Sequence, residues 1–128
     1  MVTLRDIETY ILGNIDELTK ECAHMCRANH VHIMLTLDVE QVYEGCEYCL
    51  IYTALDHLNL PTLSLSSGIE YVILDDAVIE VLENGVAIYS MSNFKERLKD
   101  LLEFGIVTKD EVKSIEEWVK SRTRTNEH

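Results

Sequence analysis

The four cysteines of the chain form two closely spaced pairs, and their thiols are the side chains best suited to chemistry. Cys22 and Cys26 are spaced C-x3-C, whereas Cys46 and Cys49 are spaced C-x2-C. Pairs at such spacings can bind a metal ion, form disulfides, carry sulfur or fill a hydrophobic core. Both pairs fall in segments with helical periodicity, where these spacings place the two sulfur atoms on one face. The sequence therefore predicts two thiol pairs on two helix faces.

Disulfides between the two pairs are one use of these thiols. Neighbours on a helix face have Cβ atoms about 5–6 Å apart, whereas a disulfide requires about 3.8 Å. Bridges within a pair are therefore disfavoured. If the two helices run parallel, Cys22 pairs with Cys46 and Cys26 pairs with Cys49. Intracellular disulfides are common in hyperthermophiles, and a composition poor in glutamine and rich in glutamate leans in that direction.

Three other uses of the same cysteines stay open. Four thiolates bind zinc tetrahedrally, although such sites usually place at least one pair on a tight turn. Free thiols packed as small hydrophobic groups are the simplest use, because both pairs lie on apolar stripes. A redox or sulfur-transfer role requires an accessible thiolate, and the acidic neighbours Glu21 and Glu47 oppose thiolate formation.

Two other sets of side chains are weaker candidates for a chemical site. His30 and His32 alternate on a predicted strand, a spacing that allows two imidazoles to chelate one metal ion, although a structural role is simpler. Asp75, Asp76 and Glu80 are residue types found in nuclease metal sites, but no lysine follows to stabilise the transition-state charge. We expect a turn at the two aspartates. The chain contains no glycine-rich phosphate loop, nucleophile elbow or dinucleotide fingerprint, so catalysis is not predicted.

Composition and charge are those of a folded protein with an acidic surface. The 128 residues carry a formal net charge of −12, with 47% hydrophobic and 27% charged residues. This charge repels the phosphates of nucleic acid, and the basic run Lys120–Arg124 is short. No apolar run approaches the roughly 18 residues of a membrane span, and no secretory signal is visible. We therefore expect a single domain over residues 1–128, a cytoplasmic location, and neither nucleic acid nor membrane as a partner.

The N-terminal segment has apolar residues at steps of three and four. This pattern predicts one helix, capped by Thr3 and running to about Ala28, with a bend near Gly13. The stripe consists of Leu4, Ile7, Ile11, Ile15, Leu18, Cys22 and Met25. Because a repeat near 3.5 residues suits a partner helix as well as the helix's own core, the stripe is a candidate homodimer surface.

The middle of the chain combines predicted strands with one further helix. A strand is expected from Val31 to Leu37, and a helix from about Val39 to Leu58, capped by Asp38. Short strands are expected over 62–66 and 70–74.

The segment from Ala77 to Met91 has two interpretations. Residues 78–82 and 86–89 form a hairpin if Asn84-Gly85 supplies the positive φ angles of a type I′ turn. A short helix over 77–83 is the alternative, and the β-branched composition favours the hairpin.

Two helices are predicted at the C-terminal end of the chain. The first is capped by Ser92 and stopped by Gly105, and the second opens with a capping box from Thr108 to Glu111. The short link between them predicts an antiparallel pair.

The segment Gly85–Asn93, with the sequence GVAIYSMSN, resembles the strand-to-helix segment of DsrE-type sulfur-relay proteins. Those proteins are small α/β proteins that pass persulfide sulfur within oligomers. Sulfur carriers among them place a cysteine near the end of that strand, where this chain has Met91. The resemblance implies sulfur handling and the helical interpretation of residues 77–83.

These elements predict a mixed α/β (α+β) fold. It has a small mixed sheet of about four to five strands, a long N-terminal helix and a C-terminal antiparallel helix pair. The predicted function is protein–protein interaction or self-assembly as a homodimer, without catalysis or a cofactor. The alternatives are a thiol-based redox or sulfur-relay protein and a protein with a structural zinc site, both using Cys22, Cys26, Cys46 and Cys49.

Overall fold

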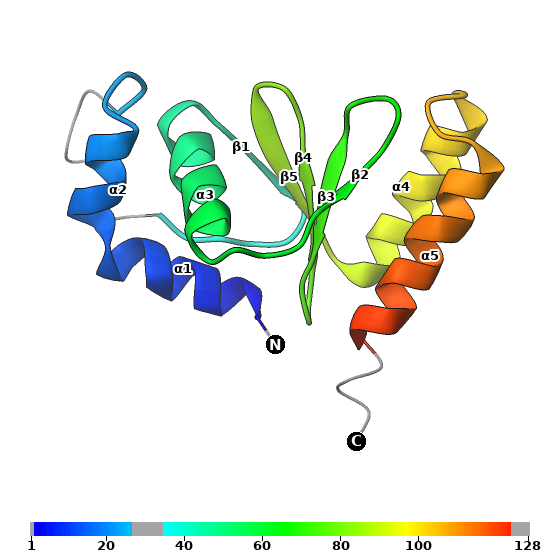
Figure 1. Cartoon of the computed structure of the whole chain (residues 1–128), viewed down its shortest axis with the longest axis horizontal. Helices are drawn as coiled ribbons and strands as arrows, with labels where there is room; N and C mark the ends of the chain where they lie inside the picture. The colour runs from blue at the N-terminus through cyan, green and yellow to red at the C-terminus, as the bar shows by residue number, and fades with distance from the viewer. Residues whose placement is uncertain (1, 27–34, 124–128) are drawn as a thin grey trace.

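The computed structural model, which describes residues 2–26 and 35–123, has a five-stranded antiparallel sheet between two layers of helices (Figure 1). The strand order is β1-β5-β4-β3-β2. The strands are β1 (Gln41–Glu44), β2 (Leu63–Ser64), β3 (Glu70–Ile73), β4 (Val78–Val81) and β5 (Gly85–Tyr89). The helices are α1 (Leu4–Gly13), α2 (Ile15–Glu21), α3 (Gly45–His57), α4 (Met91–Glu103) and α5 (Lys109–Thr123). The α+β class is confirmed, whereas the sheet is antiparallel and not mixed.

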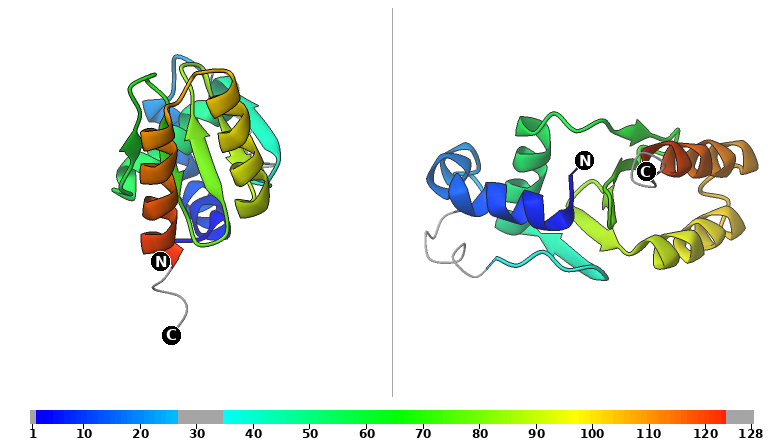
Figure 2. Two further views of the ribbon diagram at one scale, coloured as in Figure 1. Left: turned by 90° about the vertical axis from the view of Figure 1, so that its right-hand side faces the viewer. Right: turned by 90° about the horizontal axis from the view of Figure 1, so that it is seen from below.

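The alternation of side chains along the strands creates two hydrophobic clusters, one on each face of the sheet. Val72 and Ile79 face α1, α2 and α3, whereas Tyr71 and Val78 face α4 and α5. The view from below shows the two helical layers on opposite sides of the sheet (Figure 2). Because both faces are covered, the sequences of β3 and β4 are apolar at almost every position.

The N-terminal segment forms two helices because the predicted long helix breaks at Asn14. The predicted cap is confirmed: Thr3 Oγ1 accepts a hydrogen bond from the Asp6 amide, and Asp6 accepts one from the Thr3 amide. Ile7, Ile11 and Leu18 have no exposed surface and pack in the protein's own core. These buried members of the stripe are therefore not available as a dimer surface, and the homodimer itself stays a prediction.

The start of the second predicted helix was also wrong, because residues 41–44 form the edge strand β1. Glu40 and Gly45 both have positive φ angles, which interrupt a helix at each end of this strand. Tyr43 is buried, and its hydroxyl donates to the Thr36 carbonyl at 2.8 Å and accepts from the Asp38 amide at 2.9 Å. Pairing with β5 and this tyrosine anchor outweigh the helical pattern. The predicted strand over 31–37 lies mostly outside the described residues, as do His30 and His32.

The hairpin prediction for residues 78–89 is confirmed, although its turn lies one residue earlier than expected. The Leu82 amide donates to the Gly85 carbonyl, which leaves Glu83 and Asn84 at the turn, neither with a positive φ. Gly85 belongs to β5, where a Cβ atom would lie 3.0 Å from the Tyr43 carbonyl oxygen. The glycine therefore suits the close approach of β1 and does not form a type I′ turn.

The C-terminal helix pair is confirmed, with one change in its caps. Ser90, and not Ser92, caps α4 by accepting a hydrogen bond from the Asn93 amide. Gly105 ends this helix region with a φ of 74°. Thr108 and Glu111 form the predicted capping box of α5, with hydrogen bonds of 3.1 Å in both directions. The two helices pack on the face of the sheet opposite α3.

Candidate functional site

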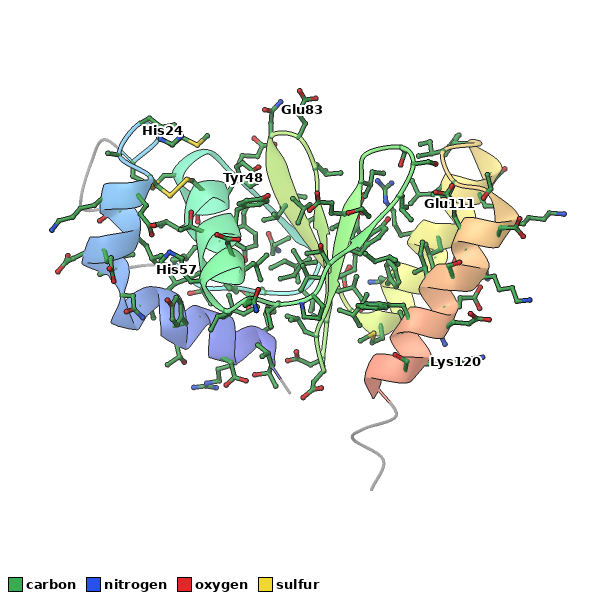
Figure 3. The ribbon with its side chains drawn as sticks, viewed as in Figure 1. His24, Tyr48, His57, Glu83, Glu111 and Lys120 are labelled. Atoms are coloured by element: carbon green, nitrogen blue, oxygen red, sulfur yellow. A yellow bond between two sulfur atoms is a disulfide. The ribbon has the colours of Figure 1, made fainter. Side chains whose placement is uncertain are left out.

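All four cysteines lie in disulfides that join residues 22–26, directly after α2, to the first turns of α3 (Figure 3). Cys22 pairs with Cys49 and Cys26 pairs with Cys46, with Cα atoms 6.0 Å and 4.8 Å apart. The connectivity expected for parallel helices was therefore wrong. The segment 22–26 runs antiparallel to the start of α3, so the first cysteine of one pair meets the last of the other.

The bonded sulfur atoms offer neither a thiolate nor a free metal ligand. The zinc and sulfur-relay hypotheses for Cys22, Cys26, Cys46 and Cys49 therefore concern a reduced form of the protein. Within residues 2–26 and 35–123, no group of three or more His, Cys, Asp or Glu side chains is arranged to hold a metal ion. Metal binding or nucleophilic chemistry in this part of the oxidised protein must come from other side chains.

A groove runs between α3 and the strands β3 and β4, and we call it the α3 groove. It consists of two hollows of about 420 Å³ and 200 Å³ that share Tyr52, Glu70 and Val81. Its ionisable and aromatic lining consists of Tyr48, Tyr52, Asp56, Glu70 and Glu83. The lining side chains that the structure describes include no lysine, arginine or histidine. The groove is therefore acidic and partly aromatic.

Regular spacing in two elements places these side chains along the α3 groove. Tyr48, Tyr52 and Asp56 follow one another at intervals of four residues on α3, so they share one helix face. Glu70 and Val72 alternate with the buried Tyr71 on β3, so both face the groove. The neighbouring strand β2 has only two residues, which leaves this part of the sheet accessible.

The two tyrosines form the aromatic wall of the α3 groove. Their ring centroids are 6.0 Å apart with an interplanar angle of 58°, and Tyr52 is 43% exposed. Partial burial, with the nearby Tyr52 and Glu70 as smaller causes, raises the pKa of the Tyr48 phenol. Figure 3 shows Tyr48 on α3 and Glu83 at the tip of the β4–β5 hairpin, at the same end of the molecule. Sequence reasoning missed this wall, whose only signal was the four-residue spacing of the tyrosines.

A hydrogen-bonded set of three side chains lies where α1, α2 and α3 meet. The Tyr10 hydroxyl from α1 lies 2.9 Å from Nδ1 of His57 at the end of α3. Nε2 of the same imidazole lies 2.8 Å from Oε2 of Glu21 at the end of α2. The three residues thus form a hydroxyl–imidazole–carboxylate chain at the protein surface. No sequence motif indicated it, because Tyr10 and His57 are 47 residues apart.

An ion pair between a fully buried carboxylate and a partly exposed arginine lies on the opposite face of the sheet. Glu80 has no exposed surface, and its carboxylate accepts two hydrogen bonds from Arg97 of α4, at 3.2 Å and 3.0 Å. Hydrogen bonding to Glu80 raises the pKa of the Arg97 guanidinium. Glu80 and Asp76, two of the carboxylates considered for a nuclease-like site, therefore have separate partners: Asp76 Oδ1 accepts a hydrogen bond from the Leu4 amide at 3.0 Å.

The Tyr71 hydroxyl is buried beside this ion pair and has no hydrogen-bond partner among the residues that the structure describes. We predict that Tyr71→Phe is neutral or stabilises the protein by about 1 kcal/mol, because it removes an unsatisfied polar group and keeps the ring. Urea denaturation at neutral pH measures the change. The matched control is Tyr43→Phe, which removes a hydroxyl with two hydrogen bonds and should destabilise the protein. A loss of stability in Tyr71→Phe would contradict the prediction.

The same substitution should change the response to alkaline pH. Burial, with the charge of Glu80 as a second cause, raises the pKa of Tyr71 above its ordinary value. The protonated form is thus favoured in the folded state, and this contribution is complete below about pH 10 and lost as the pH rises above it. The advantage of Tyr71→Phe over the wild type should therefore grow above about pH 10, which a series of denaturation curves measures.

Neither a protein-family model, nor a curated protein, nor a solved structure matches the chain. The resemblance of Gly85–Asn93 to DsrE-type proteins required a helix over residues 77–83, and this expectation was wrong because Val78–Val81 form strand β4. In the part of the chain that the structure describes, no helix has the length and apolar character needed to cross a membrane.

Proposed function

We propose that the protein acts without catalysis, by binding a positively charged segment of another protein in the α3 groove. The observation that carries this proposal is the combination of three carboxylates and two tyrosine rings along one groove. An arginine or lysine side chain fits both features, because its charge is attracted by the carboxylates and its cationic head stacks on an aromatic face.

The whole-protein charge supports a basic partner over a second copy of the chain. A net charge of −12 attracts basic proteins over a distance and accelerates their encounter. Two copies of this chain carry the same charge and repel each other. Most of the apolar stripe that suggested a homodimer is also buried within the protein, although Met25 is exposed. A heterologous partner is therefore the better-supported form of the predicted protein–protein interaction.

The binding proposal predicts a specific loss of affinity when the α3 groove is altered. A fluorescently labelled arginine-rich glycine–serine peptide serves as the probe, and fluorescence anisotropy at about 0.15 M salt measures its affinity. Glu70→Gln should weaken binding about tenfold, since it removes a carboxylate from the point where the two hollows meet. Tyr52→Ala should weaken binding by a similar factor, because it removes the exposed ring.

The matched control is Glu103→Gln, which removes the same charge at an exposed position on α4. It should change the affinity less than about twofold, because an exposed charge away from the groove contributes little. Equal effects of Glu70→Gln and Glu103→Gln would mean that the peptide binds by overall charge alone. A glutamate-rich peptide of the same length should not bind.

A further inference from the structure

We propose that Tyr10 is an activated nucleophile that accepts an acyl group, with His57 as its base and Glu21 as the group that orients the base. The donor class is an activated acyl compound, in which a carbonyl carbon carries a good leaving group. This inference is independent of peptide binding in the α3 groove. It rests on the hydroxyl–imidazole–carboxylate chain formed by α1, α3 and α2.

The carboxylate of Glu21 favours the imidazole tautomer that can act as a base toward Tyr10. In the neutral imidazole, the Nε2 proton is donated to Glu21 Oε2 at 2.8 Å, so Nδ1 carries the lone pair. That lone pair accepts the Tyr10 hydroxyl proton across 2.9 Å, which is within the range required of a general base. The ring planes of Tyr10 and His57 are nearly perpendicular, at 81°. The Tyr10 hydroxyl therefore has a base placed to remove its proton.

The proposed step is a balanced acyl transfer without a change of oxidation state. The Tyr10 oxygen attacks the carbonyl carbon of the donor, and its proton moves to His57 Nδ1. The bond between the carbonyl carbon and the leaving group then breaks, and the proton passes from Nδ1 to the leaving group. The products are an acyl ester of Tyr10 and the free leaving group. Glu21 stabilises the positive charge that the imidazole carries during the step.

This chain of side chains is partly accessible to a reagent, with the ring of Tyr10 half-buried against the hydrophobic core. The side chains of His57 and Glu21 are 25% and 47% exposed, and Figure 3 shows His57 where α1, α2 and α3 meet. Tyrosines elsewhere have other neighbours. The Tyr43 hydroxyl contacts backbone groups, and the ring of Tyr52 lies beside that of Tyr48. Tyr52 is therefore a suitable internal reference, since it is 43% exposed and lies on the same helix as His57.

The test is acetylation by p-nitrophenyl acetate, followed residue by residue with peptide mass spectrometry. Tyr10 should be acetylated at least about tenfold faster than Tyr52, because a positioned general base accelerates such steps by about two orders of magnitude or more. His57→Gln should lower the Tyr10 rate to about that of Tyr52. Glu21→Gln keeps the imidazole and should give an intermediate rate. Tyr10→Phe should abolish the fast site.

The acetylation rate of Tyr52 in each variant shows whether a substitution has changed the structure as well as the reaction at Tyr10. An unchanged Tyr52 rate with a lost Tyr10 rate supports the proposal. If His57→Gln also changes the acetylation rate of Tyr52, the Glu21→Gln variant is the deciding test, because it leaves the imidazole ring in place. Acetylation of Tyr10 no faster than Tyr52 in the wild type would overturn the proposal. Fast acetylation of Tyr10 in a folded His57→Gln variant, or acetylation of His57 in place of Tyr10, would also overturn the proposal.

Discussion

Removing both disulfides should lower the free energy of unfolding by about 6 kcal/mol, the largest effect that we expect for this chain. The bridges close loops with sequence separations of 27 and 20 residues, and the smaller loop lies inside the larger one. Each bridge limits the conformational freedom of the unfolded chain. Because either remaining bridge still closes most of the same loop, removing one should cost only about 2–3 kcal/mol.

Because one loop lies inside the other, the losses of stability on removing the two bridges should not be additive. The paired variants Cys22→Ala/Cys49→Ala and Cys26→Ala/Cys46→Ala should each lose less than half of what the fourfold variant loses. Urea denaturation of the wild type and the three variants measures these losses. The wild type reduced with dithiothreitol controls for packing, since it keeps every sulfur atom. Equal stability of the reduced and native protein would mean that the cysteines act as packed thiols and that the bridges contribute nothing.

Arg97→Met should destabilise the protein by about 3–5 kcal/mol, because it leaves the fully buried carboxylate of Glu80 without its partner. The double variant Glu80→Met/Arg97→Met should recover most of this loss. Replacing a buried ion pair by apolar side chains of similar volume is often neutral or stabilising. The free energy of unfolding from urea denaturation, compared across the wild type, both single variants and the double variant, measures the coupling.

A neighbouring ion pair on the same helix provides the control. Lys99 lies 3.5 Å from Glu96, and both side chains are well exposed. Lys99→Met should change the stability by less than about 1 kcal/mol, since exposed pairs contribute little. If Arg97→Met were as mild as Lys99→Met, the buried carboxylate would have found another partner or a proton. That result would contradict a stabilising role for Arg97 as the partner of Glu80.

Short-range features of the structure agreed well with the sequence. The capping groups Thr3 and Thr108 lie three residues before their acidic partners, Asp6 and Glu111, and both boxes form. The hairpin over 78–89 and the stop at Gly105 were also predicted and found. These features depend on residues within a few positions of one another, where backbone geometry and side-chain type suffice.

Predictions that depended on distant partners were less successful. Residues 41–44 have a helical pattern in the sequence. In the structure they pair with β5 at four positions, and the side chain of Tyr43 is buried. The turn of the β4–β5 hairpin lies one residue earlier than predicted, and Gly85 pairs with Glu44 of β1 and takes no part in the turn. In both cases, contact with a segment about 40 residues away outweighed the local preference.

Local sequence patterns were enough to predict the class of the fold and most of its helices and strands, and they favoured cysteine bridges between the two pairs over bridges within them. Which cysteines meet depended on the packed structure, because the relative direction of residues 22–26 and α3 sets the connectivity. The α3 groove and the Tyr10–His57–Glu21 chain likewise arise only on folding. Their residues come from separate helices and strands. The spacing of residues along the chain does not predict which helix ends and strand faces pack together.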